Sequence, residues 1–163
     1  MSNEEVYEEL DKAFSKLKEE LKFESNFEEL EKVFFLKDDA LGTGFISNRY
    51  DRQLCARIVN TYFSWYNHLH SILMPNPSSI VNMTENQAFS DEEKNDLNLL
   101  MNKMMAYVSK NNVIGITKNM QAQGPFIDEG LKFWNEEIKE KLEFVMKRIQ
   151  EHWMKYSDPK NNN

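Results

Sequence analysis

Cysteine is almost absent from this chain, which has only Cys55 among its 163 residues. An internal disulfide is therefore excluded, and a lone cysteine suits a reducing compartment. The chain also lacks an apolar run of the roughly 18 residues that a membrane span needs. Its acidic start, MSNEEVYEEL, lacks the basic and apolar regions of a secretory signal. We therefore expect a soluble, cytoplasmic protein.

The periodicity of a β-sheet is also missing, because no segment alternates apolar and polar residues over a useful length. Apolar residues instead recur every three or four positions, which is the spacing of amphipathic helices. The fold class is therefore predicted to be all-α, a bundle of about four to six helices. We expect one helical domain over residues 1–156 and a flexible polar tail over residues 157–163.

Negative charge is concentrated at one end of the chain. Residues 1–40 carry 13 acidic and 6 basic residues, so this arm accounts for the whole net charge of −7. Residues 41–163 carry 14 residues of each sign. Binding of nucleic acid or of anionic lipid depends mainly on clustered Lys and Arg, so neither is favoured.

Three capping signatures, each a serine followed three positions later by a glutamate, predict helix starts at Ser2, Ser25 and Ser90. The apolar spacing that follows extends these helices over about residues 2–22, 25–36 and 90–110. A break is expected at LGTGF, residues 41–45, where two glycines allow the chain to reverse. Residues 78–89 are expected to hold one or two helical turns around Ile80 and Met83.

A stretch without any charged residue, residues 58–84, lies in the middle of a chain that is 29% charged. The helix predicted over about residues 48–73, capped by Ser47 or Asn48, contains most of it. This helix has an apolar row that predicts burial inside the bundle: Leu54, Ile58, Tyr62, Trp65, Leu69 and Ile72. Beside that row runs a narrow uncharged polar row: Asn60, Ser64, Asn67 and Ser71.

A long C-terminal helix is predicted over about residues 126–156, with Pro125 at its first turn. Its apolar residues repeat every 11 positions, close to the twist of a straight helix. At 1.5 Å per residue it spans roughly 45 Å, the length of a whole bundle. Residues 111–124 are long for a plain connection, and a short helix or an ordered loop is expected there.

Catalytic and metal-binding motifs are missing from the sequence. His68 and His70 lie two positions apart, so they face different sides of a helix and cannot share one ion. There is no HExxH motif, no ExxH pair and no second cysteine. Cys55 and His68 are about 20 Å apart along one helix. We therefore expect no metal, no cofactor and no catalytic residues, although an unusual hydrolase using His68 or His152 is a third hypothesis.

A candidate anion site is formed by Thr43 of the Gly-Thr-Gly loop with Arg49, Arg52 and Arg57. Amides at a helix N-terminus together with arginine bind anions such as phosphate. In the alternative interpretation the glycines make a turn and the arginines pair with the acidic N-terminal arm. The loop is not a Walker motif, because GK[ST] is missing.

Two further groups of residues are candidates for contact with a partner. The row Asn60, Ser64, Asn67 and Ser71 forms an internal polar network, lines a small-molecule pocket or packs against another helix or subunit. Met101, Met104 and Met105 form either an adaptable part of the core or a partner surface, since methionine accommodates varied shapes.

Taken together, these features favour a non-catalytic helical protein that acts by association with a protein partner, either another protein or a second copy. The alternative is binding of a small anionic or nucleotide-like ligand at the Gly-Thr-Gly loop and the arginines that follow it.

Overall fold

The computed structural model describes residues 2–161, and the regular elements in this range are all helical, as the sequence predicted. The α-helices are α1 (Asn3–Leu21), α2 (Phe27–Phe34), α3 (Leu36–Thr43), α4 (Tyr50–Leu73), α5 (Ile80–Asn86), α6 (Asp91–Thr117), α7 (Gln123–Phe133) and α8 (Lys139–Ser157). A π-helical turn, Trp134–Ile138, joins α7 to α8. The short helix α5 forms where one or two helical turns were expected. None of the helices in residues 2–161 is long and apolar enough to cross a membrane.

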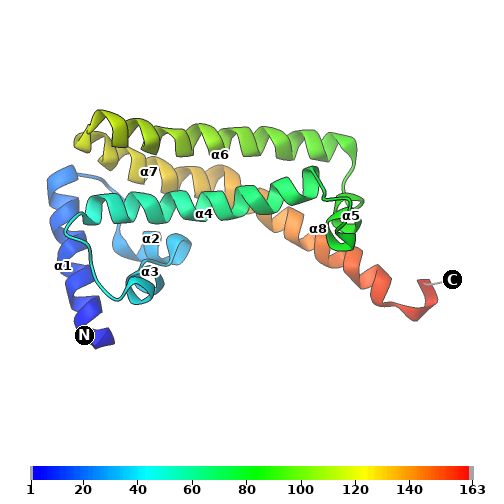
Figure 1. The fold of residues 1–163 in the computed structure, drawn as a ribbon, viewed down its shortest axis with the longest axis horizontal. Helices are drawn as coiled ribbons and strands as arrows, with labels where there is room; N and C mark the ends of the chain where they lie inside the picture. Colours follow the sequence, from blue (N-terminus) through cyan, green and yellow to red (C-terminus); the bar gives the residue numbers. More distant parts are fainter. Residues whose placement is uncertain (1, 162–163) are drawn as a thin grey trace.

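Helices α4, α6 and α7 lie side by side, and α1, α2 and α3 pack at one end of this layer (Figure 1). At the other end α5 folds back on α4, and α8 runs out diagonally away from α6. The inner face of α4 is the middle of the core, with Leu54, Ile58, Tyr62, Leu69 and Ile72 all buried. This confirms the predicted apolar row, of which Trp65 alone is half-buried.

Two of the three predicted helix starts are confirmed in atomic detail. The Ser2 hydroxyl accepts a hydrogen bond from the Glu5 amide, and the Glu5 carboxylate accepts one from the Ser2 amide. The same reciprocal pair joins Ser90 and Glu93 at the start of α6. Both capping boxes were predictable from the sequence, because a capping box involves only residues three positions apart.

The third predicted start, Ser25 with Glu28, is wrong by one residue. The cap of α2 is Asn26, whose side chain accepts from the Glu29 amide at 2.9 Å. Ser25 instead donates its hydroxyl to the Asp128 carboxylate at 2.6 Å, a contact with α7 that is distant in the sequence. Ser25 therefore makes a tertiary contact with α7 and does not cap α2.

The segment between α2 and α4 contains a helix that the sequence did not reveal. Phe35 adopts a left-handed conformation with φ of 53° and ends α2, after which α3 begins with Asp38 and Asp39 in its first turn. Gly44, with φ of 73°, ends α3. The expected break is therefore present, but it begins only at Gly44, the second glycine of LGTGF, and runs to residue 49.

The start of α4 differs from its prediction. Its cap is Arg49, whose side chain forms no capping hydrogen bond. The hydroxyl of Ser47, one of the two predicted caps, accepts from the amide of Arg49 at 3.0 Å instead. The first turn of α4 is therefore left without a side-chain cap.

Helix α6 is about two turns longer than predicted and continues to Thr117, because Asn111 and Ile114 extend its buried face. A single 3-10 turn, Met120–Ala122, then leads into α7. The expected C-terminal helix therefore begins three residues earlier than predicted, at Gln123. Most of residues 111–124 are helical.

The C-terminal helix is also interrupted by its π-helical turn. Tyr62 of α4 donates its hydroxyl to the carbonyl of Gly130 at 2.7 Å, just before that turn. A side chain that competes for a helix carbonyl is a recognised cause of such irregularities. After α8 the chain forms a short 3-10 turn, Pro159–Asn161, and the last two residues of the predicted polar tail lie outside the described range.

Candidate functional site

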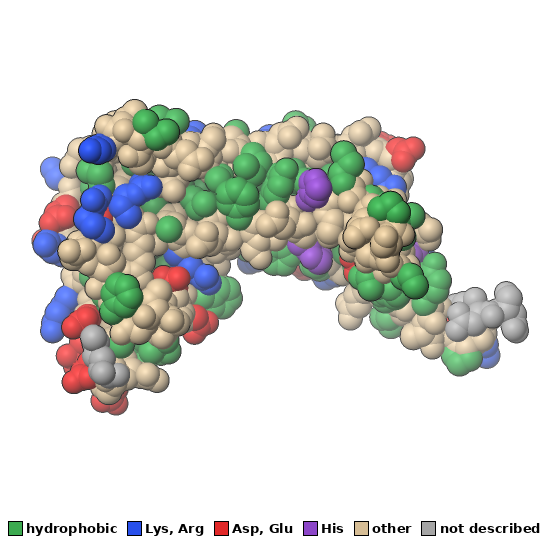
Figure 2. Space-filling view, in the orientation of Figure 1, with side chains coloured by type: hydrophobic (Ala, Val, Ile, Leu, Met, Phe, Trp, Pro, Cys, Tyr) green, Lys and Arg blue, Asp and Glu red, His purple; other side chains and the backbone are tan. Residues whose placement is uncertain are grey.

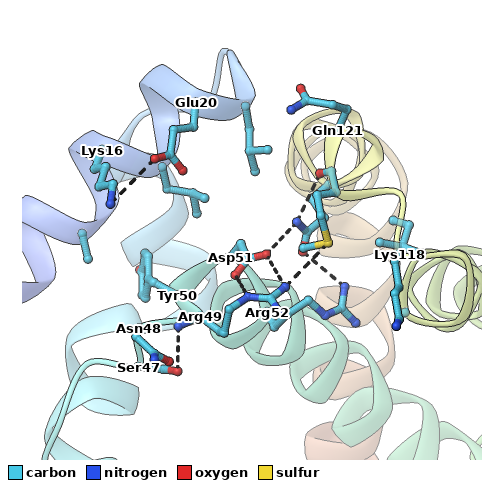
Figure 3. Close-up of a pocket in the computed structure, with 17 residues that line it drawn as sticks. Lys16, Glu20, Ser47, Asn48, Arg49, Tyr50, Asp51, Arg52, Lys118 and Gln121 are labelled. Atoms are coloured by element: carbon cyan, nitrogen blue, oxygen red, sulfur yellow. Dashed lines mark hydrogen bonds and ion pairs between the residues drawn. The ribbon is translucent and has the colours of Figure 1, made fainter.

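A pocket of about 1050 Å³ lies where the N-terminus of α4 meets α1, the end of α6 and the start of α7 (Figure 3). Its apolar lining residues are Ala13, Leu17 and Leu21 from α1, Ile114 from α6 and Met120 from the 3-10 turn. The charged side chains around it are Lys16, Glu20, Arg49, Asp51, Arg52 and Lys118. The pocket therefore includes Arg49 and Arg52, two of the four residues predicted for an anion site.

Asp51 and Gln123 form the centre of the polar side of this pocket. Asp51 accepts from the Arg49 guanidinium at 3.0 and 3.1 Å and from the Gln123 amide nitrogen at 3.0 Å. The Gln123 side-chain oxygen accepts from Arg52 at 3.2 Å and lies 3.7 Å from the sulfur of Cys55. Gln123 is fully buried, so it connects α4 rigidly to the start of α7.

The ionisation of Asp51 reflects these contacts. Partial burial acts to raise the pKa of Asp51, but hydrogen bonds from Arg49, Gln123 and the Arg52 amide outweigh it and hold that pKa below its ordinary value. The same pairing raises the pKa of Arg49. Burial raises the pKa of the Cys55 thiol to about 12, so Cys55 is not a thiolate nucleophile at neutral pH.

The cations of the pocket fall into two classes. Lys16 pairs with Glu20 at 3.8 Å, and Arg49 is already paired with the carboxylate beside it. Arg52 and Lys118 form no ion pair within 4.0 Å in residues 2–161. Both acidic side chains of the pocket are thus neutralised, whereas two of its cations are not.

The other two residues of the predicted anion site lie elsewhere. The hydroxyl of Thr43 lies within 3.0–3.2 Å of the carbonyls of Asp39, Ala40 and Phe45 and completes the end of α3. Arg57 donates to the carbonyl of Phe34 and so satisfies the last turn of α2. The structure therefore brings Arg49 and Arg52 together but places Thr43 and Arg57 in helix-terminal roles.

The uncharged polar row of α4 lies on the surface. Asn60, Ser64 and Asn67 are exposed, and the half-buried Ser71 donates to the carbonyl of His68 at 2.6 Å. None of the four lines the pocket at the start of α4. Because three of the four side chains are exposed, the row does not form an internal polar network. Contact with a partner stays a prediction.

This row is part of a larger uncharged surface, which we call the α4–α5 face. It consists of the exposed residues between positions 58 and 84: Asn60, Phe63, Ser64, Asn67, His70, Met74, Asn76, Pro77, Ser78, Ile80, Val81 and Met83. In Figure 2 the side chains over the middle of α4 and over α5 are mostly hydrophobic or uncharged, whereas most of the Lys, Arg, Asp and Glu side chains in this view lie toward the end of the molecule where α1, α2 and α3 pack. Ile80 is 81% exposed and Met74 is 70% exposed.

The methionine patch predicted on α6 is not a surface. Met101 and Met104 are 4% and 0% exposed and belong to the core, and Met105 is half-buried. The prediction of a partner surface at Met101 and Met104 is therefore wrong, because α6 turns this face toward α4. Met101 and Met104 are instead part of the core, which is the alternative interpretation of these residues.

No group of three or more His, Cys, Asp and Glu side chains within residues 2–161 is arranged to hold a metal ion. The side chains of His68 and His152 are each half-buried, with an Nε2 atom that lacks a hydrogen-bond partner in the described part of the chain. A smaller pocket of about 440 Å³ lies between α6 and α7. Its lining includes the ion pairs Lys103–Glu137 and Lys110–Glu129.

Comparison with known proteins adds no relative: no protein-family model matches this chain, and neither does any curated protein or solved structure.

The pocket residues that were not among the predicted site residues include Lys16, Lys118 and Gln123. Lys16 is one of several lysines on the polar side of α1, and nothing in its spacing distinguishes it. Lys118 and Gln123 belong to residues 111–124, where the weak periodicity predicted no orientation for any side chain. Only the docking of four separate elements places these residues around one space.

Proposed function

We propose that this protein acts without catalysis, through protein–protein association at the α4–α5 face. The observation that carries the proposal is the absence of every charged residue from positions 58–84, although twelve side chains in that stretch are exposed. The centres of protein interfaces are depleted in Lys, Glu and Asp and enriched in aromatic residues and methionine. The exposed Phe63, Met74 and Met83 fit that composition.

The physical reason concerns the cost of covering the surface. A buried lysine or glutamate loses about 1.5–2 kcal/mol of side-chain entropy and must also give up its hydration. Asn60, Ser64 and Asn67 are shorter and uncharged, and they can exchange hydrogen bonds with water for hydrogen bonds with a partner. Ile80 and Val81, which are 81% and 52% exposed, contribute apolar area that association would remove from water.

The organisation of α4 supports the same proposal. Asn60, Ser64 and Asn67 recur at the spacing of one helix face, and Phe63 packs edge-on against Tyr66 at 6.3 Å between ring centroids. A helix that offers such a continuous stripe suits a helix from a second copy of the chain or from another protein. The lone buried cysteine supports a cytoplasmic location, which we propose with it.

The experiment measures the molar mass by light scattering over a range of protein concentrations. Two exposed apolar residues of the face are replaced together in the variant Phe63→Glu/Val81→Glu. The matched control is Phe144→Glu/Val113→Glu, which changes the same residue types at similar exposure away from the face. We expect the mass of the natural chain and of the control to rise with concentration, and the mass of the face variant to stay that of a monomer.

A different protein as partner is tested by pull-down with the same three chains. Support requires a partner that both the natural chain and the control retain and that the face variant loses in a binding assay with purified components. The proposal is contradicted if the natural chain is monomeric throughout and the three chains retain the same proteins. Equal masses for the three chains at high concentration also count against the α4–α5 face.

A further inference from the structure

The pocket at the start of α4 is two-sided, and its two sides suit different parts of one ligand. Its lining includes Ala13, Leu17 and Leu21 from α1 and Arg52 from α4. In Figure 3 the α1 side chains Lys16 and Glu20 lie across the pocket from Arg49 and Arg52. Ligand pockets generally combine apolar walls with a few placed polar groups. The volume of about 1050 Å³ far exceeds that of a simple inorganic ion. A ligand that fills this space therefore has an organic body.

The polar side of the pocket has unused positive charge. The guanidinium of Arg52 carries five N–H donors, and its only protein hydrogen bond in residues 2–161 is the one to Gln123 at 3.2 Å. Lys118 forms no ion pair in the same range. Because the protein as a whole has a net charge of −7, a local excess of cations is not a consequence of composition.

The backbone at the start of α4 adds to this charge. The amides of Tyr50 and Asp51 donate to no acceptor within the described residues, and the side chain of the cap residue Arg49 forms no capping hydrogen bond. Unpaired amides at the start of a long helix carry partial positive charge and favour an anion. Helix α6 ends beside the same pocket, and its terminal carbonyls have the opposite effect.

We propose that this pocket binds a small organic anion, a molecule with a phosphate or carboxylate group on a largely apolar or planar body. The anionic group lies against Arg52, Lys118 and the first amides of α4, and the body lies against the apolar wall formed by Leu17 and Leu21. Asp51 and Arg49 neutralise each other and hold Gln123, which in turn orients Arg52. This site is separate from the α4–α5 face and does not depend on association.

The experiment is isothermal titration calorimetry with four probes. AMP combines a phosphate with a planar body, octanoate combines a carboxylate with an apolar chain, adenosine is a body without charge, and inorganic phosphate is an anionic group without a body. We expect AMP or octanoate to bind, with an affinity that falls as salt is added. Adenosine and inorganic phosphate are expected to bind at least 10-fold more weakly. The AMP and octanoate titrations distinguish a phosphate on a planar body from a carboxylate on an apolar chain.

Variants of the pocket show whether the probe binds where we propose. Arg52→Ala and Lys118→Ala are each expected to weaken binding by about 10-fold or more, as expected for loss of a hydrogen bond between charged groups. Lys118 is exposed, so its replacement leaves the fold intact even if Arg52→Ala disturbs the contact with Gln123. Lys12→Ala is the control, because Lys12 is an exposed lysine on α1 that does not line the pocket.

The proposal is overturned if none of the four probes binds the natural chain. It is also overturned if AMP or octanoate binds the natural chain and the Lys118→Ala variant equally well. Inorganic phosphate binding as tightly as AMP and octanoate would refute the role assigned to the apolar wall. Because none of these variants touches the α4–α5 face, failure here is distinguishable from failure of the proposed association.

Discussion

Replacement of Gly130 by alanine tests how closely α7 packs against α4 and α6. A β-carbon at position 130 would overlap the hydroxyl of Tyr107 and would lie 3.0 Å from Cζ of that ring and 3.1 Å from Cγ2 of Ile58. The Tyr107 hydroxyl cannot easily move, since it donates to the carbonyl of Phe126 at 2.8 Å in a buried position. Gly130→Ala must therefore either break this hydrogen bond or push α7 away.

The expected magnitude follows from three contributions. Overpacking of a dense core costs about 1–3 kcal/mol. Loss of the hydrogen bond from Tyr107 adds about 0.5–1.5 kcal/mol. Alanine is the better helix former by about 1 kcal/mol, which offsets part of the loss. Gly130→Ala should therefore lower the free energy of unfolding by roughly 1–3 kcal/mol, or the melting temperature by about 2–4 °C for each kcal/mol.

The assay is a double-mutant cycle by urea denaturation with Tyr107→Phe. Removal of the hydroxyl relieves the worst overlap at Gly130, so the double variant should be more stable than the sum of the single effects predicts. We expect a coupling energy of about 1–2 kcal/mol, within the range for residues in contact. The reasoning is refuted if Gly130→Ala costs the same with tyrosine and with phenylalanine at position 107, or if it stabilises the natural chain.

Three further predictions concern other contacts. Gly124→Ala should destabilise the protein by about 1–3 kcal/mol, because the added β-carbon would lie 2.6 Å from the carbonyl oxygen of Leu21 in α1. Gly42→Ala should instead stabilise α3 by about 0.4–1 kcal/mol, because its β-carbon would have no neighbour within 4 Å. Thermal melts compare the two variants. Asp51→Asn should reduce the free energy of unfolding at neutral pH, because the pKa of Asp51 is lowered in the folded protein and its ionised carboxylate is therefore stabilising. This contribution is lost when Asp51 is protonated. Urea denaturation should therefore show the stability difference between the variant and the natural chain shrinking as the pH falls below about 3.9. Arg148→Ala should lower the free energy of unfolding by about 1 kcal/mol in the same denaturation assay, because two nitrogens of the Arg148 guanidinium donate to the Glu93 carboxylate at 3.0 and 3.2 Å. Arg148→Lys should recover only part of this loss, because an ammonium group cannot make this paired contact.

The features predictable from the sequence depend on short distances along the chain. The capping boxes at Ser2 and Ser90 appear at the predicted positions, since each involves residues three positions apart within one turn. The buried row of α4 from Leu54 to Ile72 was predictable for a related reason, because helical periodicity alone defines which residues share a face. Helix boundaries were less accurate at α6, where the buried Asn111 carries the helix past its expected end.

The candidate site was only half predictable. Arg49 and Arg52 were found because a helix start with arginines is a recognisable local pattern. Lys16 and Lys118 were not found, because they come from α1 and the end of α6 and reach the pocket only through docking. Arg57 was also predicted from its place near the start of α4, but it does not line the pocket. Tertiary packing places its guanidinium against the carbonyl of Phe34 instead.

The sequence by itself determined that the chain is helical, which residues share each helix face and that residues 58–84 carry no charge. Only the tertiary structure decided which of those faces are covered. Met104 was equally suited to a core or to a partner surface, and it is buried because α6 packs this side against α4. Asn60 was equally suited to an internal network, and it is exposed because no element of residues 2–161 covers that side of α4. Periodicity describes one helix at a time, whereas burial depends on where the other helices dock.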